Sequence, residues 1–272
     1  MSHPFFALPA PIVIGHRGAA GERPENTLPS FERALADGAA ILESDVHLTR
    51  DGVPVLIHDD DVERCTDGRG RVRDHDLASL QRFDAGYRFE SETGAHPFRG
   101  LGIRVPTLVE ALAAFPRARF NLELKEHLPG MAAQSVAAVA AAGRAADVLL
   151  TSANDALMAE LRAHVAAERV DVALGASTGE VARFAVAALR GDAPPAGPMA
   201  LQIPAEFAGR PLVTRELVEH AHRHGVQVHV WTIDEPSEMC ALLALGVDGI
   251  VTNYPARLAR LLAARAPRER TA

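Results

Sequence analysis

The chain has 272 residues, a length at which single α/β barrels are common, and it combines 48% hydrophobic with 23% charged residues. Its net charge of −7 and its dispersed basic residues exclude a basic surface that could follow a phosphate backbone, so nucleic acid is not an expected partner. The two cysteines, Cys65 and Cys240, are too few for a disulfide framework and are not spaced as zinc ligands.

The N-terminal segment, residues 1–14, has no Lys or Arg before its apolar residues and is interrupted by Pro4, Pro9 and Pro11. Neither a signal peptide nor a membrane span has this pattern. We therefore expect a cytoplasmic protein with no stable membrane insertion.

Short β-branched runs alternate with Ala- and Leu-rich stretches along the chain, which predicts a parallel sheet flanked by helices. Eight such runs suit a (β/α)8 TIM barrel of the α/β class. An open doubly wound sheet is the alternative, but no Gly-rich dinucleotide or P-loop fingerprint follows the first run. The expected strands are Ile12–His16, Ile41–Val46, Phe120–Glu123, Val148–Thr151, Val172–Leu174, Ala200–Gln202, Val228–Thr232 and Gly249–Thr252.

Polar residues stand at the expected helix starts. Thr27 can cap a helix that Gly38 ends, and Thr107, Asn154 and Thr214 precede later helices in the same way. Glu25 and Asn26 have two interpretations: they could orient groups of the site, or they could cap the turn before the first helix. Capping explains them adequately, so we leave both out of the predicted site.

Residues 59–104 interrupt the alternation because they are rich in Asp, Arg and Gly and exceed the usual length of a βα connection. We predict that they form a small insertion over the barrel mouth. The insertion is expected to lie within a single domain that spans residues 1–272.

Charged pairs mark the ends of two expected strands. Glu43 and Asp45 lie two residues apart, so side-chain alternation places both on one face near the C-terminal end of their strand. Glu123 and Lys125 repeat this arrangement on another strand. Lys125 is also the only lysine among 28 basic residues, which indicates that arginine does not serve there.

Three carboxylates at one barrel mouth need a compensating charge, because two carboxylates about 4 Å apart repel by roughly 4 kcal/mol at an effective dielectric near 20. All-oxygen ligation favours Mg²⁺ or Ca²⁺ over zinc. We therefore expect one divalent metal ion. The alternative is that the acids form separate surface ion pairs with arginines.

His16 and Arg17 close the first expected strand, where Gly15 and Gly18 let the backbone approach a ligand closely. His58 closes a second apolar run, residues 53–57. Imidazoles titrate in the range that acid–base catalysis at neutral pH requires, so these two histidines are candidates for that role. Other histidines are expected to be surface or packed residues: His47, His96, His222, His224 and His229.

A series of short motifs occurs in a fixed order along the chain. They are HRG at 16–18, PENT at 24–27, ESDV at 43–46, DG at 51–52, HD at 58–59, VPTL at 105–108, FNLELK at 120–125, VWT at 230–232 and GVDGIVTNYP at 246–255. In kind and order these motifs resemble those of the glycerophosphodiester phosphodiesterases over nearly the whole chain.

The resemblance implies a metal-dependent hydrolase that cleaves a small glycerophosphodiester to glycerol 3-phosphate and an alcohol. Direct attack by water and attack by a neighbouring glycerol hydroxyl both stay open, as does which histidine is the base. Residues 59–104 would be the family's insertion beside the mouth, where it helps to shape the glycerol pocket. The implied site has the metal on Glu43, Asp45 and Glu123, the acid/base pair His16 and His58, and the phosphate on Arg17 and Lys125.

Two further features concern the pocket. Trp231, the only tryptophan, ends an expected strand, where its ring can pack against the glycerol carbons; filling of the barrel interior is the alternative. Ala153 departs from the family, which often has an aromatic residue after the serine at this point in the chain.

Two other functions have to be compared with this one. A lysophospholipase D or sphingomyelinase D-like enzyme shares the metal and histidines but must accommodate an acyl chain, and no amphipathic membrane-binding segment supports it. A non-catalytic binding barrel belongs to a different class. The complete set of charged and histidine residues argues against that class.

Overall fold

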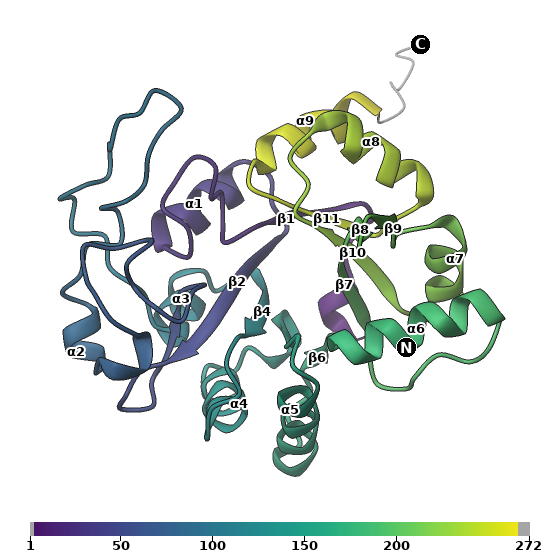
Figure 1. The fold of residues 1–272 in the computed structure, drawn as a ribbon, viewed down its shortest axis with the longest axis horizontal. Coiled ribbons are helices and arrows are strands. Elements are labelled where there is room, and N and C mark those ends of the chain that lie inside the picture. Colours follow the sequence, from purple (N-terminus) through teal and green to yellow (C-terminus); the bar gives the residue numbers. More distant parts are fainter. Residues whose placement is uncertain (1–2, 266–272) are drawn as a thin grey trace.

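Eight parallel strands form a barrel in the computed structural model, which describes residues 3–265 (Figure 1). Their order around the barrel is β6-β5-β4-β2-β1-β11-β10-β7. The barrel closes between β6 and β7, where the Met199 N–H donates a hydrogen bond to the Leu174 carbonyl at 2.9 Å. The predicted barrel is therefore confirmed, with strands β1 (Ile12–Gly15), β2 (Ile41–Leu48), β4 (Arg119–Leu124), β5 (Val148–Thr151), β6 (Ala173–Leu174), β7 (Ala200–Pro204), β10 (Gln227–Trp231) and β11 (Gly249–Thr252).

Helices cover the outside of the barrel, and the predicted caps are confirmed at their first turns. The Thr27, Thr107, Asn154 and Thr214 side chains each accept a backbone N–H in the first turn of the helix that follows. The helices outside the insertion are α1 (Leu28–Ala36), α3 (Leu108–Ala114), α4 (Met131–Ala141), α5 (Asp155–Glu168), α6 (Thr178–Arg190), α7 (Arg215–Arg223), α8 (Pro236–Leu245) and α9 (Pro255–Arg265), with 3₁₀ turns η1 (Pro4–Phe6) and η3 (Ala145–Asp147).

Strand register brings the charged residues together. The ladder between β2 and β4 pairs Glu43 with Asn121 and Asp45 with Glu123. Because side chains alternate along each strand, the two charged pairs face the same side of the sheet, as the sequence predicts. Phe5 and Phe6 of η1 pack against the barrel strands and are buried there. They fill the barrel interior far from this mouth.

The insertion, residues 59–104, packs at the side of the barrel near α1 and β2 (Figure 1). It contains η2 (Val72–Asp74) and the short helix α2 (Leu77–Leu80). Its apolar side chains form a small separate core with β3 (Pro54–Leu56), which pairs antiparallel with β2. This core fixes the insertion as an extension of the barrel.

Within residues 3–265, none of the helices combines the length and hydrophobicity that a membrane crossing requires. The cytoplasmic location stays a prediction.

The buried histidine of β10 gives the fold a pH dependence. Burial lowers the pKa of His229 to about 4. Below an unfolded pKa of about 6.5 the unfolded chain binds a proton that the folded chain does not, so stability present above that pH is lost as pH falls toward 4. We expect this residue to cost about 2 kcal/mol of unfolding free energy between pH 7 and pH 5.

Urea titrations of the wild type and a His229→Asn variant at both pH values measure the effect. The variant should lose about 2 kcal/mol less between the two pH values than the wild type. Equal losses in the two proteins would show that His229 does not carry this dependence.

Candidate active site

A cavity of about 460 Å³ opens at the C-terminal ends of the barrel strands. All the side chains predicted for the site line it, although they come from five separate segments of the chain. No residue of the insertion lines it, so within the described residues the insertion reaches the site indirectly. The predicted residues in the lining are His16, Arg17, Glu43, Asp45, His58, Glu123, Lys125 and Trp231.

Asp45 is 1% exposed, yet it carries a charge. Lys125 Nζ lies 3.0 Å from Asp45 Oδ1, and Arg17 Nε lies 3.1 Å from Oδ2. Asn26 Nδ2 also donates to Oδ2, at 3.0 Å. Burial acts to raise the pKa of Asp45, but Lys125 and Arg17 outweigh it and lower that pKa. Asp45 is therefore ionised at neutral pH.

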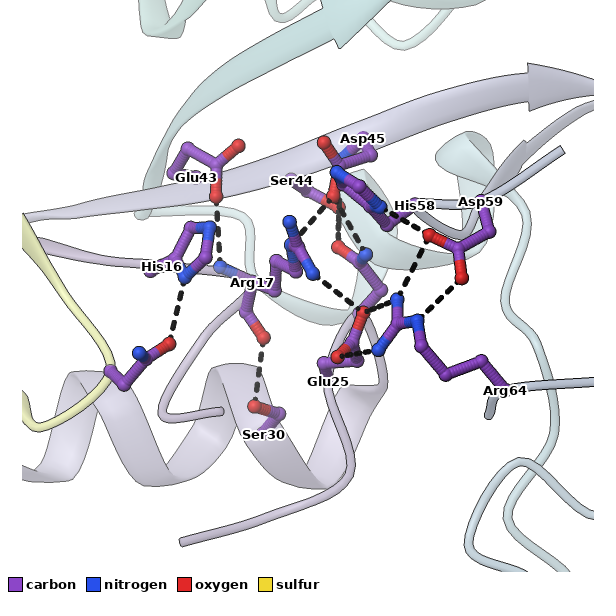
Figure 2. A network of polar contacts seen from close by, with 12 residues as sticks. His16, Arg17, Glu25, Ser30, Glu43, Ser44, Asp45, His58, Asp59 and Arg64 are labelled. Carbon is purple, nitrogen blue, oxygen red and sulfur yellow. Dashed lines mark hydrogen bonds and ion pairs between the residues drawn. The ribbon is translucent and has the colours of Figure 1, made fainter. Parts of the chain in front are cut away.

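Glu43 is held by backbone instead of a cationic side chain. The Arg17 N–H donates to Glu43 Oε2 at 2.9 Å, from a residue in the left-handed region at φ 49°. The Ser30 hydroxyl donates to the Arg17 carbonyl (Figure 2). The Asn26 N–H donates to the same oxygen at 3.0 Å, and the two bonds fix this conformation. Burial, followed by the charge of Asp45, raises the pKa of Glu43 well above its usual value.

The three carboxylates suit a hard divalent cation in donor type and in charge. In the described part of the chain, no three acidic, His or Cys side chains stand in a ligating arrangement. Lys125 Nζ instead bridges Asp45 and Glu123, 2.9 Å from Glu123 Oε2. Burial, and next the charges of Asp45 and Glu123, raise the pKa of Glu43 although Arg17 acts to lower it. Oxygen donors with excess charge fit Mg²⁺ or Ca²⁺.

His16 is oriented by a chain of hydrogen bonds that ends on Asp234. Asn253 Nδ2 donates to Asp234 Oδ2 at 2.7 Å, which places the amide oxygen of Asn253 2.7 Å from His16 Nδ1. An amide oxygen only accepts, so Nδ1 carries the proton and Nε2 is left as an acceptor. Burial, and next Arg17, lower the pKa of His16, which is therefore neutral at pH 7.

His58 is oriented by its neighbour in the chain and by the insertion. Asp59 Oδ1 lies 2.5 Å from His58 Nδ1, and His47 Nε2 lies 3.0 Å from the His58 carbonyl. Partial burial acts to raise the pKa of Asp59, but hydrogen bonds from Arg64 and His58 lower it to about 2. The charged carboxylate of Asp59 thus holds the imidazole, while the buried His47 fixes the backbone of His58.

Arg64 connects the insertion to both sides of the site (Figure 2). Its Nη1 and Nη2 each lie 2.7 Å from an oxygen of Glu25, and its Nε donates to Asp59 Oδ2. Glu25 Oε1 also accepts from Arg17 Nη1 at 3.0 Å. A guanidinium is planar, so this bidentate contact fixes direction as well as charge. Arg64 therefore positions His58 through Asp59 and Arg17 through Glu25.

For Glu25 and Asn26 the preferred interpretation as caps is wrong, and the alternative, that they orient groups of the site, agrees with their contacts. Thr27 is the cap of α1, whereas Glu25 binds two arginines and Asn26 donates to Asp45. Asn26 Oδ1 also accepts from the Ser44 hydroxyl at 2.6 Å. The sequence did hold a signal for this role. The PENT motif has several polar residues, and only one of them is needed to cap the helix, so the others are available for the site.

Two other positions noted in the sequence, Trp231 and Ala153, also lie at the cavity. Trp231 is 44% exposed and lines the cavity, which excludes the alternative that it fills the barrel interior. Ala153, where the chain departs from the family pattern, also lines the cavity.

Among the histidines expected to be packed or on the surface, His47 and His229 are buried, whereas His96, His222 and His224 are exposed.

Comparison with known proteins agrees with this geometry. The sequence profile of the Glycerophosphoryl diester phosphodiesterase family matches residues 16–257. A glycerophosphodiester phosphodiesterase of Caldanaerobacter subterraneus subsp. tengcongensis is 32% identical over 92% of this chain and 97% of its own. A human lysophospholipase D is 26% identical over 90% of this chain and 84% of its own.

A solved structure is similar along its whole length. It is an Oleispira antarctica phosphodiesterase in complex with the product sn-glycerol-3-phosphate. Its TM-score to this chain is 0.74 at 27% identity, and the match covers 93% of this chain and 97% of that chain.

The contacts of Arg64 predict a loss of turnover with a smaller loss of binding. We expect Arg64→Gln to lower kcat by on the order of 10-fold, because His58 loses its orientation, and to raise KM by about a few-fold, because Glu25 then holds Arg17 less firmly. In a His58→Ala background the same change should have almost no further effect on kcat.

Steady-state kinetics of the single and double variants measure this coupling. Arg71→Gln is the matched control, because Arg71 belongs to the insertion and pairs only loosely with Asp60 at 4.0 Å. Equal losses in both backgrounds, or a loss shared by Arg71→Gln, would mean that Arg64 acts only on the stability of the insertion.

Proposed function

The chain belongs to the glycerophosphoryl diester phosphodiesterase family and is a phosphoric diester hydrolase, and we propose that it uses one divalent metal ion, Mg²⁺ or Ca²⁺, to release glycerol 3-phosphate and an alcohol from a glycerophosphodiester. One observation carries the proposal: a single cavity contains two cationic side chains, two oriented histidines and three carboxylates. Membership of an enzyme family removes the alternative of a non-catalytic barrel.

The phosphate is bound by Arg17 and Lys125. Both side chains reach the cavity from strands that end at its mouth, and both are fixed by acids: Glu25 and Asp45 hold Arg17, while Asp45 and Glu123 hold Lys125. Positive charge that is placed before the reaction stabilises the charge that develops on the phosphoryl oxygens without further reorganisation.

Glu43, Asp45 and Glu123 are the residues that would hold the metal. When bound, it supplies Lewis-acid polarisation of a phosphoryl oxygen. Its charge would also offset the repulsion that raises the pKa of Glu43 beside Asp45. The surface ion pairs considered as an alternative are not favoured, because Glu43 and Asp45 are buried.

The histidines carry the two proton transfers. His16 is neutral and presents Nε2 as an acceptor, which supports it as the group that takes a proton from the attacking hydroxyl. His58 then gives a proton to the departing alkoxide. Its ring is held by Asp59, so its free nitrogen faces the cavity that it lines.

Loss of one carboxylate is expected to weaken metal binding and to relieve repulsion in the metal-free protein. Glu43→Gln should lose activity and keep the fold. In chelator its thermal midpoint should equal or exceed that of the wild type, and added Mg²⁺ or Ca²⁺ should raise it less. Thermal melts with and without metal measure both effects.

Glu216→Gln serves as the control for Glu43→Gln, because Glu216 is an exposed acid on α7. Its metal response should match that of the wild type. Full metal stabilisation of Glu43→Gln would contradict the assignment of Glu43 as a ligand.

The only lysine of the chain is expected to resist replacement by arginine. Lys125 Nζ lies within 3.0 Å of two carboxylates, where a compact ammonium fits and a planar guanidinium needs more room. We expect Lys125→Arg to lower kcat/KM by on the order of 100-fold, or about 2.7 kcal/mol of transition-state stabilisation, with little effect on folding.

Steady-state kinetics of the metal-saturated protein test this, with Arg190→Lys at the exposed end of α6 as the control. Activity of Lys125→Arg within a few-fold of wild type would mean that only the positive charge matters at this position.

A further inference from the structure

The wall of the catalytic cavity also contains a patch of uncharged polar side chains. Asn121 on β4, Thr151 at the end of β5 and Gln202 on β7 all line the cavity. Strands β4, β5, β6 and β7 are consecutive around the barrel, so these side chains come from one sector of its wall. We name the three residues, together with Gly175 directly after β6, the amide patch.

The amide patch extends deep into the cavity. Asn121 precedes the predicted metal ligand Glu123 by two residues on the same strand face, so it lies roughly 6–7 Å farther from the mouth. Asn121 is 4% exposed. At the opening, by contrast, Phe207 is 67% exposed in a hairpin of β8 (Glu206–Phe207) and β9 (Arg210–Pro211). A group that reaches Asn121 is therefore enclosed by protein.

Two amides form the centre of the patch. Gln202 Nε2 donates to Asn121 Oδ1 at 3.3 Å. This bond leaves one nitrogen and one oxygen, Asn121 Nδ2 and Gln202 Oε1, and the same number is left if both amides are turned round. Gln202 Oε1 is buried and has no hydrogen-bond partner among residues 3–265. Buried polar atoms are seldom left in this state, so a ligand group is expected to complete the pair.

Gly175 makes room for the acceptors of the patch. A Cβ at this position would lie 2.4 Å from Thr151 Oγ1 and 2.5 Å from Gln202 Oε1, so a larger residue would displace both oxygens. The buried Thr151 hydroxyl donates to the Ala176 carbonyl at the long distance of 3.4 Å, and its oxygen can still accept. The missing side chain thus keeps two acceptors close together.

The groups of the amide patch match an uncharged ligand group that both donates and accepts. No titratable side chain belongs to the patch, so an ammonium group would be desolvated there without an opposite charge. An ether or carbonyl oxygen only accepts and would leave the acceptors of the patch unpaired. A hydroxyl can donate to one of these acceptors and accept from the free amide nitrogen.

We propose that the amide patch binds a hydroxyl group of the substrate, with Asn121 and Gln202 as specificity-determining residues. The hydroxyl belongs either to the glycerol or to a departing alcohol that is itself a polyol. This inference rests on the proposed function, because the hydroxyl has to be attached to the phosphodiester that Arg17 and Lys125 bind in the same cavity.

Two comparisons, both at saturating Mg²⁺ or Ca²⁺, distinguish the sources of the hydroxyl. The first measures competitive inhibition by glycerol 3-phosphate and by its two analogues that each lack one hydroxyl, so that no bond is made or broken. The second compares kcat/KM for the propyl and 3-hydroxypropyl esters of glycerol 3-phosphate. We expect one comparison to show a preference for the hydroxyl on the order of 100-fold, because its loss leaves buried polar groups unpaired.

Variants show whether the amide patch is what recognises the hydroxyl. Gln202→Met keeps the length of the side chain without its amide, and Gly175→Ala displaces the two acceptors. Each should lower the preference by about 10-fold, and a ratio within one protein is not affected by the fraction that folds. Gln227→Met is the matched control, because Gln227 is on the adjacent strand β10 and lies 2.9 Å from His229 Nε2 but does not line the cavity. Its preference should equal that of the wild type.

Three outcomes would overturn the inference. Equal inhibition by all three phosphates, together with equal hydrolysis of both esters, would remove the hydroxyl-binding role and leave the phosphodiesterase function standing. A preference that Gln202→Met and Gly175→Ala retain in full, or that Gln227→Met loses equally, would show that the amide patch does not bind the hydroxyl. Failure to hydrolyse every glycerophosphodiester with either metal would reject the proposed function as well.

Discussion

The site depends on the buried charge of Asp45. A carboxylate at this depth is stable only when cations and donors surround it, and Arg17, Lys125 and Asn26 provide them within 3.1 Å. Removal of one partner from such a buried pair typically costs about 3–5 kcal/mol, because the other charge is then left without compensation. The geometry of the phosphate-binding cations is therefore set by the acid that they neutralise.

The same network extends to His58 and explains why the insertion matters. Glu25 joins Arg17 to Arg64, and Arg64 joins Glu25 to Asp59, which holds His58. The insertion thus acts on the reaction without lining the cavity. Cations fixed in this way by acids bind a phosphate with little reorganisation, which links the ion-pair network to catalysis.

The sequence predicts most of this arrangement where it depends on local periodicity. Strand alternation is enough to place Glu43 and Asp45 on one face, and the β2–β4 register confirms their meeting with Glu123. Contacts between distant segments were not predictable in this way. Arg64 and Glu25 are 39 positions apart, and His16 and Asn253 are 237 apart, so only the packed structure shows that they meet.

Metal dependence is the central claim, and a titration of the metal-depleted wild-type protein tests it most directly. Release of glycerol 3-phosphate from glycerophosphocholine and the thermal midpoint would be followed together while Mg²⁺ or Ca²⁺ is added. The account predicts no release without metal, and a return of activity that parallels the rise in midpoint and saturates at one ion per chain. Full turnover in the thoroughly depleted protein would contradict it.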